Sequence, residues 1–258
     1  MPEDRVYLIT GSHSGIGYAI AEACLAQGGC VMIHGRGADE LEAAQMRLGD
    51  RAAAYVGDLS DPETPRRLVE ACVERFGRLD GLVNNAAMLT RSTIEDFSAA
   101  HFDQMAAVNI RAPLLLIQHA LPYLERNESS GAIVNIGSIN AYCGAPNLLA
   151  YSATKAALMT TTRNLGDALG GRNIRINQVN VGWTLTENEH RMQLSEGQPE
   201  DWLDHLSPVF APRGMILKPA EVAHHVLFWL SEQSAPATGQ VYELEQYPVI
   251  GRNRISAR

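Results

Sequence analysis

Val6-Tyr-Leu-Ile-Thr10-Gly11-Ser-His-Ser-Gly15-Ile-Gly17 is the stretch that decides the fold. Its first four residues form a short apolar run, typical of a buried parallel strand that stops at a turn. From Gly15 onward apolar residues recur at helical spacing, and this pattern ends at Gly28-Gly29. The stretch therefore predicts a strand, a glycine turn and a helix in immediate succession.

The glycine turn has the composition of a phosphate-binding loop. Without side chains, the backbone can turn tightly and approach a pyrophosphate, whose charge the helix amino terminus stabilises. The other interpretation is an ordinary glycine loop between a strand and a helix. Because a strand precedes the turn and a helix follows it, we favour nucleotide binding. The predicted cofactor contacts in this turn are Gly11, Ser14, Gly15, Ile16 and Gly17.

Strand-like and helix-like segments alternate along the rest of the chain. The helix at 61–76 is expected to start at Asp61-Pro62, with Asp as cap and Pro in the first turn. The alternation predicts an α/β fold: a Rossmann-like, right-handed, doubly wound, seven-stranded parallel sheet with helices on both faces. Since no linker interrupts it, we expect a single domain over residues 1–258. Further strands are predicted at 30–33, 53–56, 81–83, 132–136, 175–181 and 240–244, and further helices at 38–48, 97–126, 151–169 and 220–230.

The composition of the chain argues against some classes of binding partner. The 258 residues carry a net charge of −8, which argues against a nucleic-acid or anionic-membrane surface and favours a small-molecule partner. The longest apolar run, 114–124, is too short to span a bilayer. The amino terminus does not have the pattern of a targeting segment. The scattered cysteines, Cys24, Cys30, Cys72 and Cys143, are therefore interpreted as reduced thiols of a cytoplasmic protein.

The ends of three strands suggest how a dinucleotide would be held. After the second strand, His34-Gly35-Arg36 has an arginine in a position suited to a 2′-phosphate, so NADP(H) is preferred over NAD(H). The other interpretation of Arg36 is a solvated loop residue, and Ser14 does not supply a second basic group. Residues Asp58 and Leu59 are expected against the adenine, and Asn85 and Ala86 against the ribose, because ligands bind at this sheet edge.

A candidate catalytic set lies around Tyr151 and Lys155. Positions four apart share a helix face, so the phenol and the ammonium can project into one cleft. A nearby cation favours the phenolate, and we expect it to lower the pKa of Tyr151 toward the range of an acid/base catalyst. Ser138 is placed to donate a hydrogen bond to a carbonyl oxygen. Asn109 is a candidate for holding a proton-relaying water; its other interpretation is a side chain at a helix bend.

Together these motifs resemble the classical short-chain dehydrogenases/reductases over Val6 to Leu244. The resemblance rests on the glycine motif, on Asn84-Asn85-Ala86, and on the set Asn109, Ser138, Tyr151 and Lys155. It implies hydride transfer between a nicotinamide and a carbonyl/alcohol carbon, with Tyr151 delivering the proton and Lys155 touching the nicotinamide ribose. It also implies a homotetramer or a dimer. Further cofactor contacts implied by the resemblance are Gly182, Thr184 and Thr186 after the sixth strand.

The sequence departs from that family in three places. Ala87 stands where the family usually has glycine, a small change. Val181-Gly182 replaces the usual Pro-Gly, which bears on the loop that contacts the nicotinamide amide. Glu243-Leu-Glu-Gln-Tyr-Pro replaces the usual carboxyl-terminal Asp-Gly-Gly, which bears on oligomer contacts and on one wall of the substrate pocket.

The substrate is the least defined part of the prediction. A mobile lid is expected over about 187–215, and its side chains are polar. With Ser138 and Tyr151, the residues Asn140 and Trp183 are predicted to contact the substrate. A polar site favours a sugar or polyol, although exposed loops are polar whatever they cover. No metal site is expected, because the histidines lack metal-ligand spacing.

Two other functions remain to be weighed. The first is a catalytically idle NAD(P)-binding sensor or subunit, against which the intact Ser138, Tyr151 and Lys155 argue. The second is an isomerase or dehydratase with tightly held cofactor; such relatives usually have longer chains and a differently spaced glycine motif. The sequence favours an NADP(H)-preferring oxidoreductase that interconverts a carbonyl and a secondary alcohol.

Overall fold

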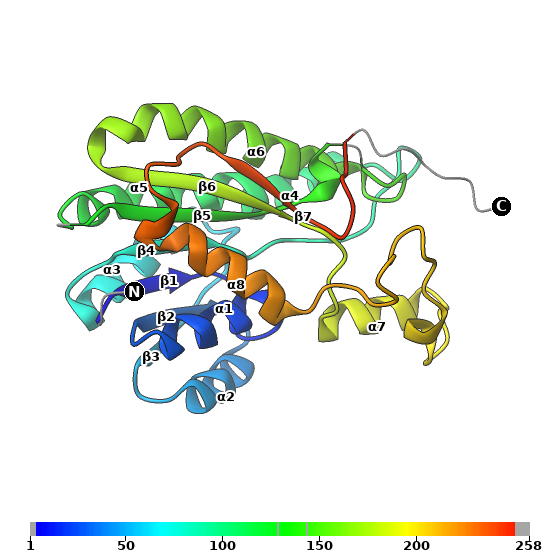
Figure 1. The fold of residues 1–258 in the computed structure, drawn as a ribbon, viewed down its shortest axis with the longest axis horizontal. Helices are drawn as coiled ribbons and strands as arrows, with labels where there is room; N and C mark the ends of the chain where they lie inside the picture. Colours follow the sequence, from blue (N-terminus) through cyan, green and yellow to red (C-terminus); the bar gives the residue numbers. More distant parts are fainter. Residues whose placement is uncertain (1–3, 128, 143, 251–258) are drawn as a thin grey trace.

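The fold is built on one parallel sheet. The computed structural model describes residues 4–127, 129–142 and 144–250. Within them, seven strands pair in the order β3-β2-β1-β4-β5-β6-β7, and all neighbouring strands of this sheet are parallel, as predicted (Figure 1). The strands are β1 Val6–Ile9, β2 Cys30–Gly35, β3 Ala52–Val56, β4 Gly81–Asn84, β5 Gly131–Ser138, β6 Ile174–Val181 and β7 Val241–Leu244.

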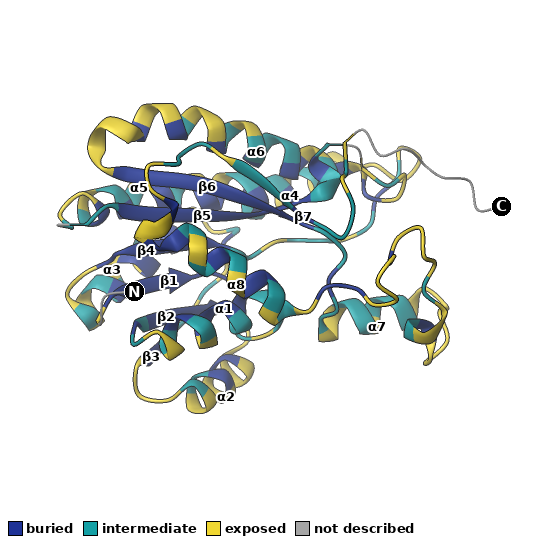
Figure 2. Cartoon of the chain, in the orientation of Figure 1, coloured by how far each residue is buried: buried dark blue, intermediate teal, exposed yellow. Residues whose placement is uncertain are grey.

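Successive side chains of β1 enter two different cores. Tyr7 and Ile9 pack into the cluster on one face of the sheet, and Val6 and Leu8 into the cluster on the other. All four are almost fully buried, as Figure 2 shows for the central strands. Because β1 is covered on both faces, its sequence is an uninterrupted apolar run without the polar alternation of a one-sided sheet.

Helices cover both faces, which confirms the predicted fold class. The first core contains side chains of α1, α2 and α8, and the second contains side chains of α3 and α5. Each crossover between parallel strands requires such a helix, and burial of its apolar stripe supplies most of its stability. Their bounds are α1 Gly15–Ala26, α2 Ala38–Leu48, α3 Thr64–Phe76, α4 Ala99–Ala106, α5 Ala112–Leu124, α6 Leu149–Leu169, α7 Glu187–Ser195 and α8 Pro219–Leu230.

Helix α3 begins later than predicted. It starts at Thr64, with Pro65 rather than Pro62 in its first turn, so the expected start at Asp61-Pro62 was wrong. The Asp61 carboxylate instead accepts a hydrogen bond from the backbone N–H of Glu63 at 3.0 Å. This local turn uses the side chain that would otherwise cap the helix, and it delays helix formation by three residues.

The long helical region before β5 contains an irregular turn. Between α4 and α5, residues Ala107–Arg111 form a π-helix, with Asn109 at its centre. A π-turn inserts one extra residue per turn and frees backbone groups from the regular helical pattern. The Asn109 side chain therefore leaves the helix at a place where the backbone is already distorted.

Buried hydrogen bonds fix α6 against the sheet. The Asn84 amide donates to Asn135 at 2.8 Å, and Asn135 donates to the hydroxyl of Thr162 on α6, also at 2.8 Å. Gln178 on β6 accepts from the same hydroxyl at 3.0 Å. Because unpaired polar groups are costly in a core, these bonds restrict α6 to one register over β5 and β6. That register positions Tyr151 and Lys155 at the carboxyl edge of the sheet.

The segment after β6 projects beyond the sheet edge (Figure 1). It contains α7, which was not predicted as a helix, and a 3₁₀ turn at Trp202–His205. An isolated parallel bridge pairs Thr184 with Leu217, so the two ends of the segment meet. This arrangement has the form of a loop closed at its base, in the region where the lid is expected.

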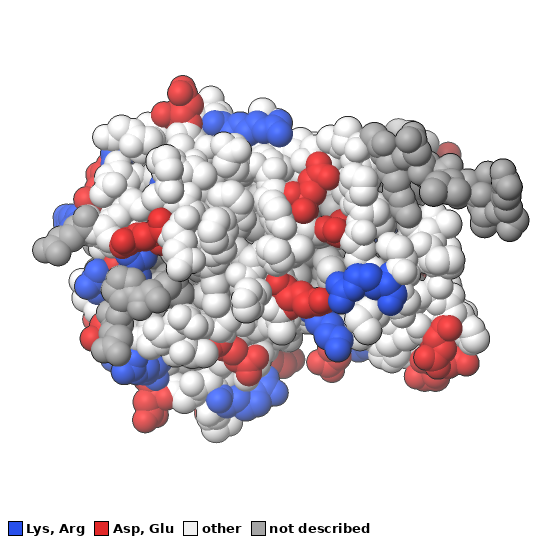
Figure 3. Space-filling view, viewed as in Figure 1, with Lys and Arg blue, Asp and Glu red and all other residues white. Residues whose placement is uncertain are grey.

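Charged side chains of both signs are interspersed on the face drawn in Figure 3. Among the described residues, no helix combines the length and apolar character needed to cross a bilayer. Cys24 and Cys72 are buried and Cys30 is half-buried, each as a free thiol. The fourth cysteine, Cys143, lies outside the described residues.

Candidate active site

The glycine turn brings backbone close to backbone. Gly11 has a φ of +61°, and a methyl group on it would lie 2.9 Å from Cα of Ala86. A methyl group on Gly17 would lie 2.4 Å from the Gly11 carbonyl oxygen. Side chains at these two positions would therefore push the turn away from β4. The turn needs glycine for its own packing, independently of any ligand.

The end of β4 is tied to the same turn. The Thr10 hydroxyl accepts hydrogen bonds from the backbone N–H groups of Asn85 and Ala86, both at 3.0 Å. The Asn85 side-chain amide donates to the carbonyls of Thr10 and Gly11, both at 2.9 Å. These bonds hold residues 85–86 beside the glycine turn, where the sequence places the cofactor ribose.

A buried imidazole connects the turn to β3. The backbone N–H of Gly11 donates to Nδ1 of His34 at 3.3 Å, and Nε2 of His34 lies 3.1 Å from the carbonyl oxygen of Gly57. Burial is the main cause that lowers the pKa of His34 to about 4. The imidazole is therefore neutral at physiological pH and bonds to both neighbours. Sequence reasoning missed this role, because both contacts join segments that are distant in the chain.

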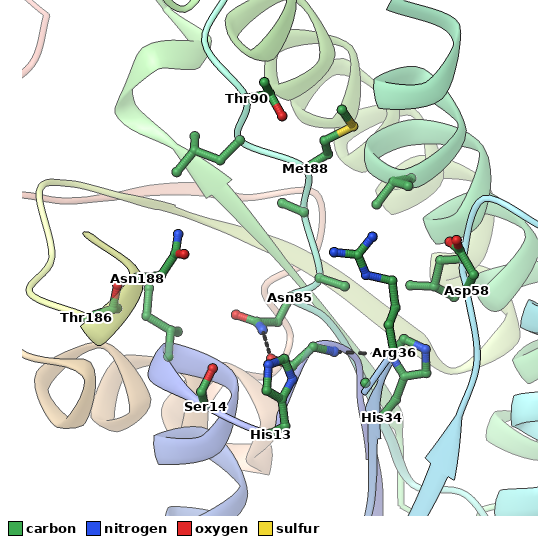
Figure 4. Close-up of a pocket in the computed structure, with 18 of the residues that line it drawn as sticks. His13, Ser14, His34, Arg36, Asp58, Asn85, Met88, Thr90, Thr186 and Asn188 are labelled. Atoms are coloured by element: carbon green, nitrogen blue, oxygen red, sulfur yellow. Dashed lines mark hydrogen bonds between the residues drawn. The ribbon is translucent and has the colours of Figure 1, made fainter. Parts of the chain in front are cut away.

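Arg36 extends into the pocket from the end of β2 (Figure 4). Its guanidinium is near enough to Asp58 to contribute to the lowering of the pKa of that carboxyl, after the larger effect of the backbone N–H of Ser60. Arg36 is exposed, and Ser14 at the start of α1 lines the same pocket. The arginine thus presents a cation to a ligand in the pocket.

Tyr151 is almost fully buried at the start of α6, 9 % exposed. Burial raises the pKa of Tyr151 to about 12; the Ser138 hydroxyl, hydrogen-bonded to the phenol, lowers it, and the negative charge of Glu189 raises it further. The expected lowering of this pKa was therefore wrong for the structure as it stands. The physical reason is that the loss of hydration outweighs the favourable contacts.

Lys155 lies one helical turn beyond Tyr151, with Nζ 5.6 Å from the centre of the tyrosine ring. Its Nζ donates to the backbone carbonyl of Ile136 on β5 at 2.8 Å. Burial lowers the pKa of Lys155 to about 8. The predicted shared helix face is present, but the ammonium bonds to the strand beneath it.

Asn109 uses its side chain to join three elements. Its Oδ1 accepts from the backbone N–H of Met88 at 2.8 Å, and its Nδ2 donates to the Met88 carbonyl and to the Thr154 hydroxyl, both at 3.0 Å. Thr154 immediately precedes Lys155. Asn109 therefore holds α6 against the segment after β4, and its part in a water relay stays a prediction.

One cavity of about 600 Å³ runs between these groups. It includes the predicted cofactor residues Gly11, Ser14, Ile16, Arg36, Asp58, Leu59, Asn85, Ala86, Tyr151 and Thr186 in its lining. The remaining predicted positions are not part of that lining: Gly15, Gly17, Lys155, Gly182 and Thr184 for the cofactor, and Ser138, Asn140 and Trp183 for the substrate.

Several lining residues were not among the individual site residues predicted from the sequence, although two of them lie in the predicted lid. They include His13 from the glycine turn, Gln104 and Val108 before and within the π-turn, and Asn188 and Arg191 from α7. Helical spacing of Asn188, Arg191 and Met192 on α7 is the one signal that predicts a shared face, and it requires knowing that the lid contains a helix.

The loop after β6 is held by the carboxyl-terminal segment. The Glu245 carboxylate accepts a hydrogen bond from the backbone N–H of Trp183 at 3.0 Å. A methyl group on Gly182 would lie 2.1 Å from the same carboxylate oxygen. Residues that replace the usual Asp-Gly-Gly therefore support the wall predicted to contact substrate. Asn140, another predicted substrate contact, donates its backbone N–H to the Ser138 hydroxyl at 3.1 Å.

A parallel sheet, a nucleotide-sized cavity at its carboxyl edge that includes Tyr151 in its lining, and the buried Ser138 and Lys155 near Tyr151 are typical of a nicotinamide-dependent oxidoreductase. A family model described as enoyl-(acyl carrier protein) reductase matches residues 11–245. The chain belongs to the classical short-chain dehydrogenase/reductase family, whose members carry out NAD(P)-dependent oxidoreduction of carbonyls and alcohols.

Three relatives illustrate the range of the similarity. The chain is 32 % identical to the 3-oxoacyl-(acyl-carrier-protein) reductase FabG of Thermotoga maritima, covering 94 % of this chain and 97 % of that protein. L-sorbose reductase from Gluconobacter frateurii, complexed with NADPH and L-sorbose, superimposes with a TM-score of 0.88 at 29 % identity, covering 94 % and 95 % of the chains. The 3-ketoacyl-(acyl-carrier-protein) reductase from Brucella melitensis, complexed with NADH, gives 0.82 at 29 % identity, covering 94 % and 97 %.

Proposed function

We propose that this protein is an NADP(H)-preferring reductase or dehydrogenase of a small polar carbonyl/alcohol substrate. The observation that carries the proposal is the contact of Tyr151 with Ser138, one helical turn from a buried Lys155, at the cavity that begins at the glycine turn. A single domain, a cytoplasmic location, a lid over 187–215 and a homotetramer are parts of the same proposal, supported by the family resemblance.

The cavity suits a dinucleotide. Its glycine turn has the close backbone approach that a pyrophosphate requires, and it is polar along the side formed by Ser14, Arg36 and Asn85. These residues would hold the diphosphate, the 2′-phosphate and the ribose respectively. When bound, the nicotinamide supplies or accepts the hydride. Arg36 is the basis of the NADP(H) preference, because its cation would pair with the extra phosphate.

The catalytic residues supply the proton and stabilise charge. Ser138 donates a hydrogen bond to the carbonyl oxygen on which negative charge develops. Tyr151 gives its proton to that oxygen; a raised pKa keeps the phenol protonated at neutral pH, as a proton donor requires. Lys155 contributes a positive charge one turn away. In the oxidative direction, the same phenolic oxygen receives the proton of the alcohol.

Replacement of Tyr151 by phenylalanine tests this proposal. We expect Tyr151→Phe to fold and to bind NADPH as the wild type does, and to lose turnover by about 100-fold or more, the lower range for acid/base catalysis. Tyr123→Phe, a tyrosine of α5 that contacts Arg126, is the matched control and should retain activity. Full activity of Tyr151→Phe would overturn the mechanism. NADPH binding without turnover of any ketone, sugar or polyol by the wild type would favour the idle sensor.

A further inference from the structure

Glu189 on α7 has the sequence position of a helix-capping acid but bonds elsewhere. Thr186 accepts the backbone N–H of Glu189 at 3.0 Å, and Thr-x-x-Glu is the pattern in which the glutamate side chain returns to the cap. Its Oε1 instead accepts from Nε1 of Trp183 at 2.7 Å and from Nε2 of Gln193 at 2.8 Å. The carboxylate is therefore directed away from the helix end and toward the loop after β6.

That loop lies beside the catalytic residues. Val181 is the register partner of Ser138 in the sheet, and Trp183 follows it by two residues. Thr186, the cap of α7, lines the cavity that includes Tyr151. The charge of Glu189 also contributes to the raised pKa of Tyr151, which places the carboxylate within electrostatic reach of the phenol. Glu189 itself is not part of the lining of that cavity, but it bonds to Trp183 in the loop beside Ser138 and its charge acts on the phenol.

Hydrogen bonds hold the Glu189 carboxylate in place through one of its two oxygens, which leaves the other oxygen available to a ligand. The indole of Trp183 stacks on Trp202 with ring centres 5.6 Å apart, and Trp202 is only 4 % exposed. Trp202 in turn donates to His190 at 2.9 Å. Among the described residues, both hydrogen-bond donors to Glu189 contact Oε1, and Oε2 accepts from none. Glu189 as a residue is half-buried, and a carboxylate oxygen that accepts no hydrogen bond is a strong acceptor for a ligand O–H or N–H.

We propose that Glu189 recognises a hydroxyl group next to the reacting carbonyl of the substrate, so that the enzyme selects α-hydroxyketones and the corresponding diols. This inference rests on the proposed function and names the substrate class of that site. The carboxylate oxygen accepts the substrate hydroxyl while Ser138 and Tyr151 hold the carbonyl oxygen. A methyl group in place of the hydroxyl leaves the carboxylate without a partner, and a substrate carboxylate meets a like charge.

The experiment compares small ketones of matched shape. Hydroxyacetone and butan-2-one differ by a hydroxyl in place of a methyl group; aminoacetone carries an ammonium and pyruvate a carboxylate next to the ketone. We expect the wild type to favour hydroxyacetone over butan-2-one by about 10- to 100-fold in kcat/KM, the range of a charge-assisted hydrogen bond, and to react poorly with pyruvate.

Two variants isolate the carboxylate. Glu189→Gln keeps an acceptor for Trp183 while removing the charge, so it should gain activity on pyruvate relative to hydroxyacetone. Glu189→Ala should bring the ratio of kcat/KM for hydroxyacetone to that for butan-2-one close to 1. Glu187→Gln, an exposed acid on the same helix, is the control and should keep all wild-type ratios.

The outcomes separate this inference from the proposed function. If no ketone is reduced by the wild type, the proposed function is wrong. If the wild type reduces butan-2-one as well as hydroxyacetone, or if Glu189→Ala keeps the wild-type ratio, only the role of Glu189 is overturned. If the wild type prefers aminoacetone over hydroxyacetone and Glu189→Gln loses this preference, then Oε2 of Glu189 binds an ammonium group. That result would overturn the proposed recognition of a hydroxyl group.

Discussion

The backbone N–H of Gly11 donates a hydrogen bond to Nδ1 of His34, at 3.3 Å. This bond joins the glycine turn, which begins the cofactor cavity, to the end of β2. Only an imidazole without a proton on Nδ1 can accept it, and the contact of Nε2 with the Gly57 carbonyl fixes the other nitrogen as the donor. The shape of the turn is therefore coupled to the protonation state of a buried histidine.

The first prediction concerns acid stability. The pKa of His34 is lowered in the folded state, from 6.5 to about 4. Between these two pH values the imidazole is protonated in the unfolded chain and neutral in the folded chain. The free energy of unfolding from this group is greatest above pH 6.5 and decreases as the pH falls toward 4, by up to a few kcal/mol. Urea unfolding of the wild type and of His34→Gln at pH 7 and pH 5 measures this change in the free energy of unfolding.

His34→Gln is expected to show a smaller loss of stability than the wild type over that interval, because glutamine does not titrate. His205→Asn is the control: its side chain is 67 % exposed, and the variant should follow the wild type. Identical pH dependence in His34→Gln and the wild type would show that the imidazole is not the group involved.

The elements that the sequence predicts correctly are those with local causes. The predicted strands agree with the structure within one or two residues, because most strands buried on both faces are apolar runs; β6 is an exception, with buried polar side chains that include Asn177 and Gln178. The predicted start of α3 was wrong because Asp61-Pro62 and Thr64-Pro65 are both plausible helix starts, and the hydrogen bond that the Asp61 carboxylate accepts from the backbone N–H of Glu63 decides between them. The role of His34 is not predictable, because both of its partners are distant in sequence.

In the candidate site too, features with a local cause are predicted from the sequence, and features that depend on contacts between distant segments are not. Spacing alone places Tyr151 and Lys155 on one helix face, and the structure has them there. Spacing cannot give the pKa of Tyr151, because burial and the charge of Glu189 both depend on how the segment after β6 folds over the site. Nor does it give Glu245 as the support for Trp183, since that contact joins two loops.

The second prediction concerns the pH dependence of ketone reduction. Burial lowers the pKa of Lys155 to about 8 and raises the pKa of Tyr151 to about 12. Below pH 8 the lysine is a cation and the phenol is protonated, which is the state proposed for reduction. We expect kcat/KM to decrease as the pH rises through about 8, because Lys155 loses its proton there while Tyr151 keeps its own.

Lys155→Arg tests which group is responsible. An arginine side chain stays charged throughout this range, so any activity that the variant retains should no longer decrease near pH 8. If the kcat/KM of Lys155→Arg decreases at the same pH as that of the wild type, another group controls the pH profile. The measurement is the initial rate of NADPH oxidation from about pH 6 to 10.

The third prediction concerns the carboxyl-terminal segment. Glu245 accepts from the backbone of Trp183, and Gln246 bonds to Arg213 and Met215, so neighbouring residues hold both ends of the segment containing α7. We expect Glu245→Ala to raise the KM for the carbonyl substrate about 3- to 10-fold, the loss of one hydrogen bond, with an unchanged Kd for NADPH. Glu42→Ala, an exposed acid on α2, is the control. A weaker NADPH affinity with an unchanged KM would contradict this role.

The last prediction concerns the choice of cofactor. Arg36 is exposed and projects into the pocket, so Arg36→Ala should weaken NADPH binding about 10-fold while leaving NADH binding nearly unchanged. Ser14 lines the same pocket, is exposed and makes no side-chain capping bond to α1. We therefore expect Ser14→Arg to tighten NADPH binding several-fold at little cost in stability. Titration of each protein with NADPH and with NADH, followed by protein fluorescence, gives the ratio of the two affinities for the wild type and for each variant. Equal affinities for NADPH and NADH in the wild type, or an Arg36→Ala variant that weakens both alike, would show that Arg36 is a solvated loop residue.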